Sequence, residues 1–162
     1  MAASDTPSAS LTESILSMMR PFVGKNLGAM PFDCVTRWLD AVLVEVERGR
    51  IVLDYTARPE MTNPAGYLHG GIQAAMLDDA MGTVCATLGY DTALLTINMT
   101  IDYLGTARAG DVIRASASVI REGKNLIHLA GGLTRGDGLI AKAQCNVLVS
   151  GKSADYVGAL AT

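Results

Sequence analysis

The segment from Gly70 to Leu88 is apolar almost all the way around a helical wheel. Apart from thioether and thiol groups, its polar side chains are few: Gln73, Asp78, Asp79, Thr83 and Thr87. A helix with so little polar surface is expected to be largely buried. The rest of the chain must therefore supply elements that enclose it.

Strand-like segments lie on both sides of this helix. Residues 38–57 contain two β-rich runs around a turn at Gly49, which predicts a hairpin. Four more strands are predicted after the helix, at 94–104, 111–120, 125–134 and 138–149. This order predicts an α+β fold, with a long central helix wrapped by a curved antiparallel sheet of about six strands. Small residues on the helix allow the sheet to approach it closely: Ala74, Ala75, Ala80, Gly82 and Ala86.

Two of the predicted strands alternate clearly between their faces. In 94–104 one face is predicted to carry Thr96, Asn98, Thr100 and Asp102. The other face is predicted to carry Leu95, Ile97, Met99, Ile101 and Tyr103. In 138–149 a single face is predicted to carry Leu139, Ala141, Ala143, Cys145, Val147 and Val149. Such alternation is typical of a sheet that packs on a core with one face.

The ends of the chain differ from this body. An amphipathic helix is predicted over 11–23, stopped around Pro21, and the central helix is expected to end near Gly89 as a C′ glycine. The first ten residues lack the basic start and apolar core of a secretory signal. The predicted organisation is a disordered tail (1–10), a helical extension (11–37), one domain (38–150) and a C-terminal tail (151–162).

Composition excludes several classes of protein. The chain has 162 residues, of which 49% are hydrophobic and 18% charged, so it is long and apolar enough for one domain with a core. A net charge of -3 gives no general attraction to nucleic acid or anionic membrane, and no apolar run has the length of a membrane span. The three cysteines are scattered without metal-ligand spacing. We interpret them as small buried hydrophobes in a reducing compartment, and we expect the cytoplasm and no metal site.

Asp78 and Asp79 interrupt the apolar helix. A buried carboxylate is costly unless it finds partners or shifts its pKa. No Lys or Arg occurs between Arg58 and Arg108, so partners must come from loops, distant strands or another subunit. Asp78 is the better functional candidate, whereas Asp79 is expected to reach solvent or cap neighbouring backbone. If the two carboxylates are close, they titrate jointly.

The loop NPAGYLHGG ends where the helix begins and leaves N–H groups of the first turn without helical acceptors. Gly70 and Gly71 allow a ligand oxygen to approach these donors, which suit the oxyanion of an acyl transfer. Asp78 lies about 13 Å further along the helix, too far to act on the same carbonyl. In an isologous dimer the partner's helix can bring its aspartate opposite this helix start. The sequence therefore predicts an active site shared between subunits.

The motif N-x-x-G-x-x-H-G-G, followed by an Asp nine residues after the His, lies between a hairpin and four strands. In this it resembles the hotdog-fold acyl-CoA thioesterases, and most of all their phenylacetate-pathway (PaaI-like) branch. The resemblance covers roughly residues 38–150. It implies the hotdog fold, a homodimer that often pairs into a tetramer, and hydrolysis of an acyl-CoA whose acyl group is aryl-acetyl or medium-chain. It implies no metal or redox cofactor, because CoA is part of the substrate.

The resemblance also implies roles for individual residues. The N–H of Gly70 would polarise the thioester carbonyl with the help of Asn63. Asp78 from the partner subunit would act on water as a general base or would itself be the nucleophile, and the sequence leaves both open. Thr96 stands where other members have Ser and would help to orient the water. His69 would orient the helix start rather than act as a base.

Coenzyme A carries several phosphates, which cations near the site would bind. Candidate residues for binding the substrate are Gly71, Arg108, Arg121, Gly123 and Lys124. For the three cations, a plain solvated surface is the alternative interpretation. His128 lies in the middle of a predicted strand and is interpreted as a packing or surface residue.

Two other functions compete with thioester hydrolysis. A hydratase or dehydratase of the same fold usually pairs a helix acid with a His at another spacing, which the HGG at the helix start disfavours. A non-catalytic acyl-CoA sensor would not need a carboxylate facing the thioester. The combination of Asn63, Gly70 and Asp78 therefore favours the enzyme.

Overall fold

The computed structural model describes residues 6–29 and 34–154 of the chain. Its helices are α1 (Ala9–Met19), α2 (Val35–Leu39) and α3 (Gly70–Ala86), with short 3-10 turns η1 (Arg20–Phe22), η2 (Leu27–Ala29) and η3 (Pro59–Met61). Its strands are β1 (Val42–Glu47), β2 (Arg50–Thr56), β3 (Thr92–Tyr103), β4 (Val112–Glu122), β5 (Leu126–Arg135) and β6 (Gly138–Ser153).

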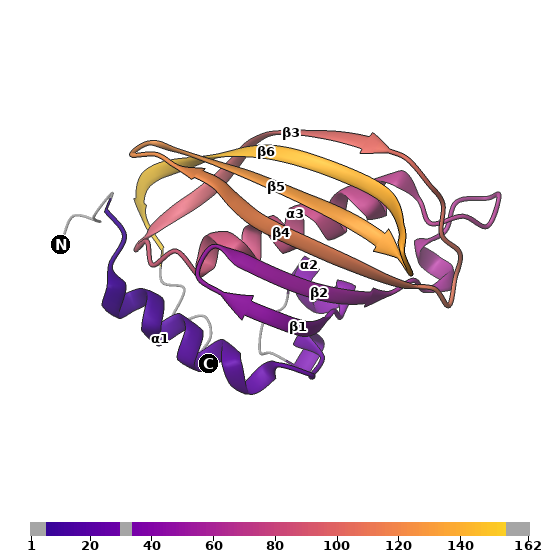
Figure 1. The fold of residues 1–162 in the computed structure, drawn as a ribbon, viewed down its shortest axis with the longest axis horizontal. Coiled ribbons are helices and arrows are strands. Elements are labelled where there is room, and N and C mark those ends of the chain that lie inside the picture. The colour runs from indigo at the N-terminus through magenta and orange to yellow at the C-terminus, as the bar shows by residue number, and fades with distance from the viewer. Residues whose placement is uncertain (1–5, 30–33, 155–162) are drawn as a thin grey trace.

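The six strands form one antiparallel sheet in the order β1-β2-β4-β5-β6-β3. The sheet curves around α3, which packs mainly against β4, β2 and β5 (Figure 1). The predicted arrangement of a long helix against a six-stranded antiparallel sheet is therefore confirmed. Strands β1 and β3 form the two edges of this sheet.

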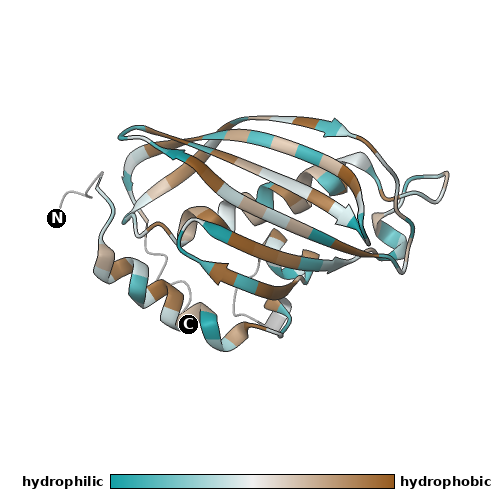
Figure 2. Ribbon diagram, viewed as in Figure 1, coloured by the Kyte–Doolittle hydropathy of each residue, from teal (hydrophilic) through white to brown (hydrophobic). Residues whose placement is uncertain are grey.

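The core lies between α3 and the concave face of the sheet. Met76, Leu77, Ala80 and Val84 of the helix are fully buried there. Hydrophobic and polar residues alternate along much of the sheet in Figure 2, and in β4 every second residue from Ile113 to Ala117 is buried. The helix is not enclosed on every side, since Gly71, Asp78 and Gly82 are exposed along one stripe.

A β-bulge corrects the predicted faces of β3. Thr96 pairs with Val147 of β6, whereas Asn98 pairs with the next residue back, Asn146, so Ile97 is an extra residue. Because Val147 is buried in the core, Thr96 faces α3, while Asn98 lies on the outer face. The prediction that Thr96 shares a face with Asn98 is therefore wrong.

A second bulge changes the predicted face of β6. Thr134 pairs with Leu139, whereas Leu133 pairs with Ala141, so Ile140 is inserted between them. Both Ile140 and Ala141 are buried, and Leu139 is 45% exposed. Leu139 is thus the one member of the predicted buried face that does not lie on it.

The N-terminal helix begins inside the segment predicted to be a disordered tail. Helix α1 begins at Ala9, and the Oγ of Ser8 caps it by accepting a hydrogen bond from the Leu11 N–H at 3.4 Å. The Ser8 N–H in turn donates to the carbonyl of Gly89 at 2.7 Å. Residues 1–5 of that predicted tail lie outside the described residues.

The predicted end of the central helix also needs correction. The last residue of α3 is Ala86, and Thr87 is its C-cap, so Gly89 lies beyond the position predicted for a C′ glycine. Gly89 nevertheless has a left-handed backbone, with φ of +80°. Helix α1 packs so closely at this point that a Cβ on Gly89 would lie 2.4 Å from the Oγ1 of Thr12.

Helix α2 was not predicted, because residues 38–41 were assigned to the first strand. Trp38 and Leu39 instead belong to α2, and β1 begins only at Val42. The helix ends at Asp40, which adopts a left-handed conformation with φ of 52° and accepts a hydrogen bond from the Gly28 N–H at 3.1 Å. At the other end, β6 continues to Ser153, beyond the predicted boundary of the domain.

Candidate active site

The start of α3 is capped by the side chain of His69. Its Nδ1 accepts a hydrogen bond from the Gly71 N–H at 2.9 Å. An accepting ring nitrogen carries no proton, so Nδ1 is the unprotonated nitrogen of this imidazole. The carbonyl of His69 accepts from the N–H groups of Ile72 and Gln73. His69 therefore caps and organises the first turn of α3.

Most donors of the first turn are thus already used, but the N–H of Gly70 is not. Among the residues that the structure describes, no group accepts a hydrogen bond from it. A Cβ on Gly71 would lie 3.1 Å from Nδ1 of His69, so glycine there leaves room for the capping imidazole. The predicted oxyanion donors therefore reduce to one main-chain N–H, that of Gly70.

Tyr103 supports the same turn and was missed by sequence reasoning, which assigned it only to an apolar face. Its hydroxyl donates to the carbonyl of Gly70 at 3.1 Å, and its ring would lie 3.5 Å from a Cβ at that position. The pair links the last residue of β3 to the first residue of α3. No local pattern signals this contact, because the two residues are 33 positions apart.

Asn63 shapes the loop that precedes α3. Its side-chain oxygen accepts hydrogen bonds from the N–H groups of Ala65 at 2.9 Å and Tyr67 at 3.2 Å. The oxygen is therefore committed to the loop, and the amide nitrogen has no acceptor within the described ranges. The amide nitrogen of Asn63 is therefore a donor without an acceptor among the described residues, in the loop that precedes α3.

Asp78 and Thr96 meet within one protomer. The Thr96 hydroxyl donates to Oδ1 of Asp78 at 3.1 Å, and Asp78 is exposed on the open stripe of α3. Asp78 lies eight residues beyond Gly70, or about 12 Å along the helix. The structure thus brings together two of the predicted catalytic residues and keeps them apart from the predicted oxyanion donor.

Asp79 is a partly buried counterpart of the exposed Asp78. Its two carboxylate oxygens accept hydrogen bonds from the hydroxyl of Thr36 in α2 and from that of Tyr55 in β2, the latter at 2.8 Å. Burial raises the pKa of Asp79 above the ordinary carboxyl range, against the lowering by both donors. Tyr55 is itself fully buried, and burial together with Asp79 holds the pKa of its phenol well above the usual value. Asp79 is thus only partly exposed, and two hydroxyl groups from other elements hold it, neither of which was predicted.

Three of the residues predicted to bind the substrate lie together in one pocket. Arg121, Gly123 and Lys124 line a cavity of about 500 Å³ at the turn between β4 and β5. His128 and Asn146 line it too. The exposed side chains of Ile120 and Leu126 give this cationic pocket apolar walls.

Arg108 precedes β4 by four residues, whereas this pocket lies where β4 ends. Its guanidinium stacks on the ring of Tyr67, 4.3 Å from the ring centroid. A Cβ on Gly66 would lie 3.5 Å from one of its nitrogens. The structure therefore places Arg108 against the Asn63 loop, at the same end as Gly70.

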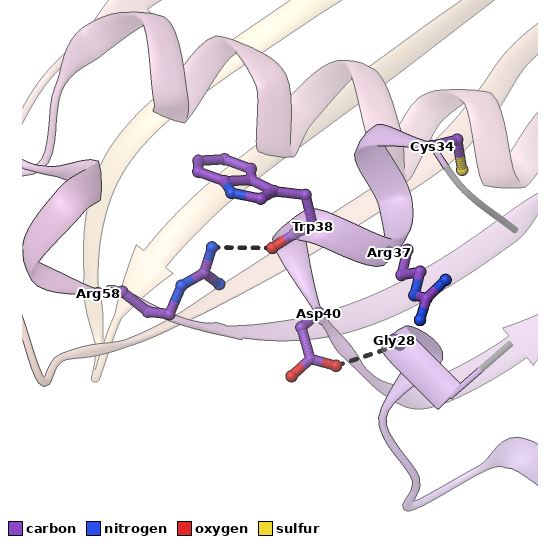
Figure 3. Close-up of a pocket in the computed structure, with 6 residues that line it drawn as sticks. All are labelled: Gly28, Cys34, Arg37, Trp38, Asp40 and Arg58. Atoms are coloured by element: carbon purple, nitrogen blue, oxygen red, sulfur yellow. Dashed lines mark hydrogen bonds between the residues drawn. The ribbon is translucent and has the colours of Figure 1, made fainter.

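A larger cavity of about 570 Å³ lies beside α2, away from the predicted residues. Figure 3 shows the Arg58 guanidinium facing Trp38, 4.8 Å from the ring centroid, while it donates to the Trp38 carbonyl at 2.8 Å. Arg58 also pairs with Glu60, and Asp40 is engaged by Gly28. Much of this cavity's polar lining is therefore satisfied within the protein.

The cysteines follow the prediction in two of three cases. Cys85 and Cys145 are buried, and burial raises the pKa of their thiols to about 12 and about 11. Cys34, in contrast, is exposed next to α2. Within residues 6–29 and 34–154, no three His, Cys, Asp or Glu side chains form a metal-binding group, and no helix there is long and apolar enough to cross a membrane.

Comparison with known proteins gives consistent relatives. The family model described as the thioesterase superfamily matches residues 65–142. A solved structure from Ralstonia eutropha JMP134, of a thioesterase described as a phenylacetic acid degradation-related protein, is 30% identical. The alignment covers 84% of this chain and 99% of that one, with a TM-score of 0.71.

Two further relatives extend the comparison. Acyl-coenzyme A thioesterase 13 of Homo sapiens is 28% identical over 118 residues, which are 72% of this chain and 79% of the relative. A thioesterase protein of Streptococcus pneumoniae TIGR4, solved with coenzyme A, is 21% identical with a TM-score of 0.65, covering 70% of this chain and 91% of that one. At that identity the last likeness concerns the fold alone. Together with the first structure it confirms the hotdog fold predicted from the sequence.

Proposed function

This chain belongs to the thioesterase superfamily, and from that premise we propose that it hydrolyses an acyl-CoA thioester to the free acid and CoA. The observation that carries the proposal is the Gly70 N–H, which lacks an acceptor among the described residues at the start of a long helix. Such a donor, aided by the helix dipole, stabilises the oxyanion that forms when a thioester carbonyl is attacked. The free amide nitrogen of Asn63 is the second donor.

Hydrolysis also needs an activated water, and Asp78 is the group we assign to it. As a general base, its carboxylate takes a proton from water while the water oxygen bonds to the carbonyl carbon. The C–S bond then breaks, and the thiolate of CoA takes up a proton. If Asp78 is instead the nucleophile, an acyl-enzyme anhydride forms first and water cleaves it. In both routes the hydrogen bond from Thr96 fixes the carboxylate.

We infer that the active site is completed by a second copy of the chain. Gly70 and Asp78 of one protomer are too far apart on the same helix to share a carbonyl. The edge strand β3 carries exposed apolar residues, Leu95, Ile97 and Tyr103, and no other described strand pairs with its outer edge. A two-fold dimer through this edge supplies Asp78 from the partner subunit to each Gly70. Association of two dimers into a tetramer remains part of the same proposal.

CoA as the carrier is supported by the pocket at the β4–β5 turn. Its cations Arg121 and Lys124 suit phosphates, and its apolar rim suits an adenine ring. Arg108 stands at the other end of the protomer, beside Gly70, where a dimer brings it toward the partner's bound substrate. The CoA in the pneumococcal relative supports this choice of substrate class. For the acyl group we propose an aryl-acetyl or medium-chain acid, with no metal or redox cofactor.

The test is release of free thiol from short, medium, long and aryl-acetyl CoA thioesters. We expect turnover by the wild type and loss of at least about a hundredfold in kcat for Asp78→Asn, as for removal of an acid–base group. Asp102→Asn is the matched control, because Asp102 is an exposed carboxylate on the outer face. A single turnover in ¹⁸O-water tests the nucleophile route, because label enters Asp78 only when Asp78 has formed the anhydride and water attacks its carboxyl carbon.

A binding protein is the competing outcome. If no CoA thioester is hydrolysed, while calorimetry shows tight binding of the same thioesters, the enzyme proposal is wrong and the sensor is favoured. The shared site is tested by measuring specific activity at decreasing protein concentration. We expect the activity to fall as the dimer dissociates into monomers. Full activity of a stable monomer would contradict it.

A further inference from the structure

The bulge in β3 decides which side chain faces Asp78. From Leu94 to Thr96 the strand pairs regularly with β6, and from Asn98 onward it pairs regularly again, one residue out of phase. Side chains alternate along a strand, so if Ile97 were paired regularly, with no bulge, Thr96 and Asn98 would share one face. Thr96 would then point away from α3, and its hydrogen bond to Asp78 would be impossible.

A bulge interrupts the main-chain hydrogen bonds between strands, and here a side-chain oxygen takes the place of a main-chain acceptor. The main-chain N–H of Asn146, on the neighbouring strand, donates to the side-chain oxygen of Asn98 at 3.2 Å. In a regular ladder a backbone carbonyl accepts this kind of bond. The side-chain amide of Asn146 donates to the same oxygen at 2.9 Å. Asn98 thus binds the strand next to it at the first residue after the bulge.

The orientation of these amides follows from chemistry. A main-chain N–H can only donate, so the atom of Asn98 that faces it must be the oxygen. Asn146 then turns its nitrogen to Asn98 and its own oxygen to Nδ1 of His128, at 3.0 Å. His128 therefore carries its proton on Nδ1. The three side chains form a polar row across β3, β6 and β5 that ends in the pocket at the β4–β5 turn.

We propose that Asn98 is a positioning residue: its side-chain oxygen holds the β3 bulge and thereby keeps Thr96 directed at the catalytic Asp78. The proposal rests on the proposed function, because it acts through residues assigned to the reaction. Asn98 itself lies on the outer face and touches neither substrate nor carboxylate. Its effect on the reaction must therefore pass through Thr96.

The test compares variants of Asn98 in the wild-type and in the Thr96→Ala background. Asn98→Leu removes the acceptor at similar size on an exposed strand position, and Asn98→Asp keeps an oxygen for both donors. Thr100→Val is the matched control, since Thr100 is the next outer-facing residue of the same strand. We expect Asn98→Leu to lower kcat roughly tenfold with little change in KM, as for a small displacement of a catalytic group. Asn98→Asp and Thr100→Val are expected to stay within about twofold of wild type.

The double mutant distinguishes positioning from a general loss of stability. In a Thr96→Ala background Asn98→Leu should have no further effect on kcat, because the group it positions is gone. An equal fold-loss in both backgrounds would overturn the proposal.

A structure of Asn98→Leu gives a readout that does not depend on activity. The proposal expects Thr96 to be displaced from Asp78 in it, and a retained hydrogen bond would overturn the proposal. If the wild type hydrolyses no thioester, the proposed function fails, and this structure still decides whether Asn98 positions Thr96.

Discussion

Replacing Tyr55 with Phe tests the account of the partly buried Asp79. Tyr55 has one hydroxyl proton but two acceptors near it: Oδ2 of Asp79 at 2.8 Å and the carbonyl of Met76 at 3.2 Å. The carboxylate is the stronger acceptor when it is charged. Tyr55→Phe therefore removes one of the two side-chain donors that stabilise a partly buried negative charge.

The magnitude follows from the nature of the acceptor. A hydrogen bond to a charged group contributes about 1.5–3 kcal/mol, and one between neutral groups about 1 kcal/mol. We expect Tyr55→Phe to lower the free energy of unfolding by about 2 kcal/mol at a pH above the raised folded pKa of Asp79, where its carboxylate is charged. For a chain of this size that corresponds to roughly 4–8 °C in Tm.

The effect should depend on pH with a definite sign. Burial raises the pKa of Asp79 in the folded state, so the folded protein binds this proton more tightly than the unfolded chain. The stability that this group contributes is then greatest below the unfolded pKa and is lost as pH rises through the folded pKa. The Tyr55 bond favours the charged form, so the loss caused by Tyr55→Phe should shrink toward about 1 kcal/mol as Asp79 takes up its proton.

Asp79→Asn, alone and combined with Tyr55→Phe, completes a double-mutant cycle. An amide at position 79 can accept from Thr36 through its oxygen and donate to the Tyr55 oxygen, leaving the phenol proton for Met76. We expect no loss of stability at pH 8, a weaker pH dependence, and a cost of only about 1 kcal/mol for Tyr55→Phe in this background.

The assay is urea unfolding at pH 5 and pH 8, followed by the fluorescence of the only tryptophan, at one protein concentration because association shifts the midpoint. If Tyr55→Phe lowers the free energy of unfolding equally at both pH values and in both backgrounds, the role given to the charge of Asp79 is refuted. A loss of more than about 2 kcal/mol for Asp79→Asn would do so as well.

Three further variants test other parts of the structure. Gly70→Ala should keep or slightly raise the Tm, since its methyl group meets only ordinary contacts, yet lower kcat/KM by at least about tenfold by obstructing the N–H; equal activity would exclude this donor. Gly89→Ala should lower the free energy of unfolding by about 2 kcal/mol or more, because the left-handed backbone disfavours a side chain and the new Cβ would lie 2.4 Å from the Oγ1 of Thr12. An unchanged denaturation midpoint would contradict the packing of α1. Reversing both charges, Arg121→Glu with Lys124→Glu, should raise KM for CoA thioesters at least about tenfold but leave thioesters of N-acetylcysteamine unaffected; equal effects on both would place the CoA phosphates elsewhere.

Periodicity was sufficient for the framework of the fold but not for its irregularities. The alternation along β3 and β6 predicted both strands, yet it could not show the extra residues Ile97 and Ile140. A bulge arises when a strand adapts to its neighbour, so it leaves no mark in the spacing of a single strand. Helix α2 was missed for a related reason: its five residues are too few for a helical period to be distinguished from a strand.

The candidate site was predictable where its residues are close in the sequence. Asn63, His69, Gly70 and Asp78 fall within one loop and one helix, and their spacing carried the resemblance. The partners of Asp79 lie 43 and 24 residues away, and nothing in the local sequence marks Thr36 or Tyr55 as donors. Long-range partners of this kind depend on tertiary packing, which a sequence pattern does not contain.

Helix α3 has almost no position left for variation. One side builds the core through Met76, Leu77 and Ala80, its first residue offers the N–H, and its open stripe presents Asp78 between glycines. A related protein that evolves a preference for another acyl group therefore has few residues in this helix that it can change. Divergence of specificity among such proteins is expected to accumulate in the segments around α3, such as α2 and the β4–β5 turn, while the helix itself stays nearly constant.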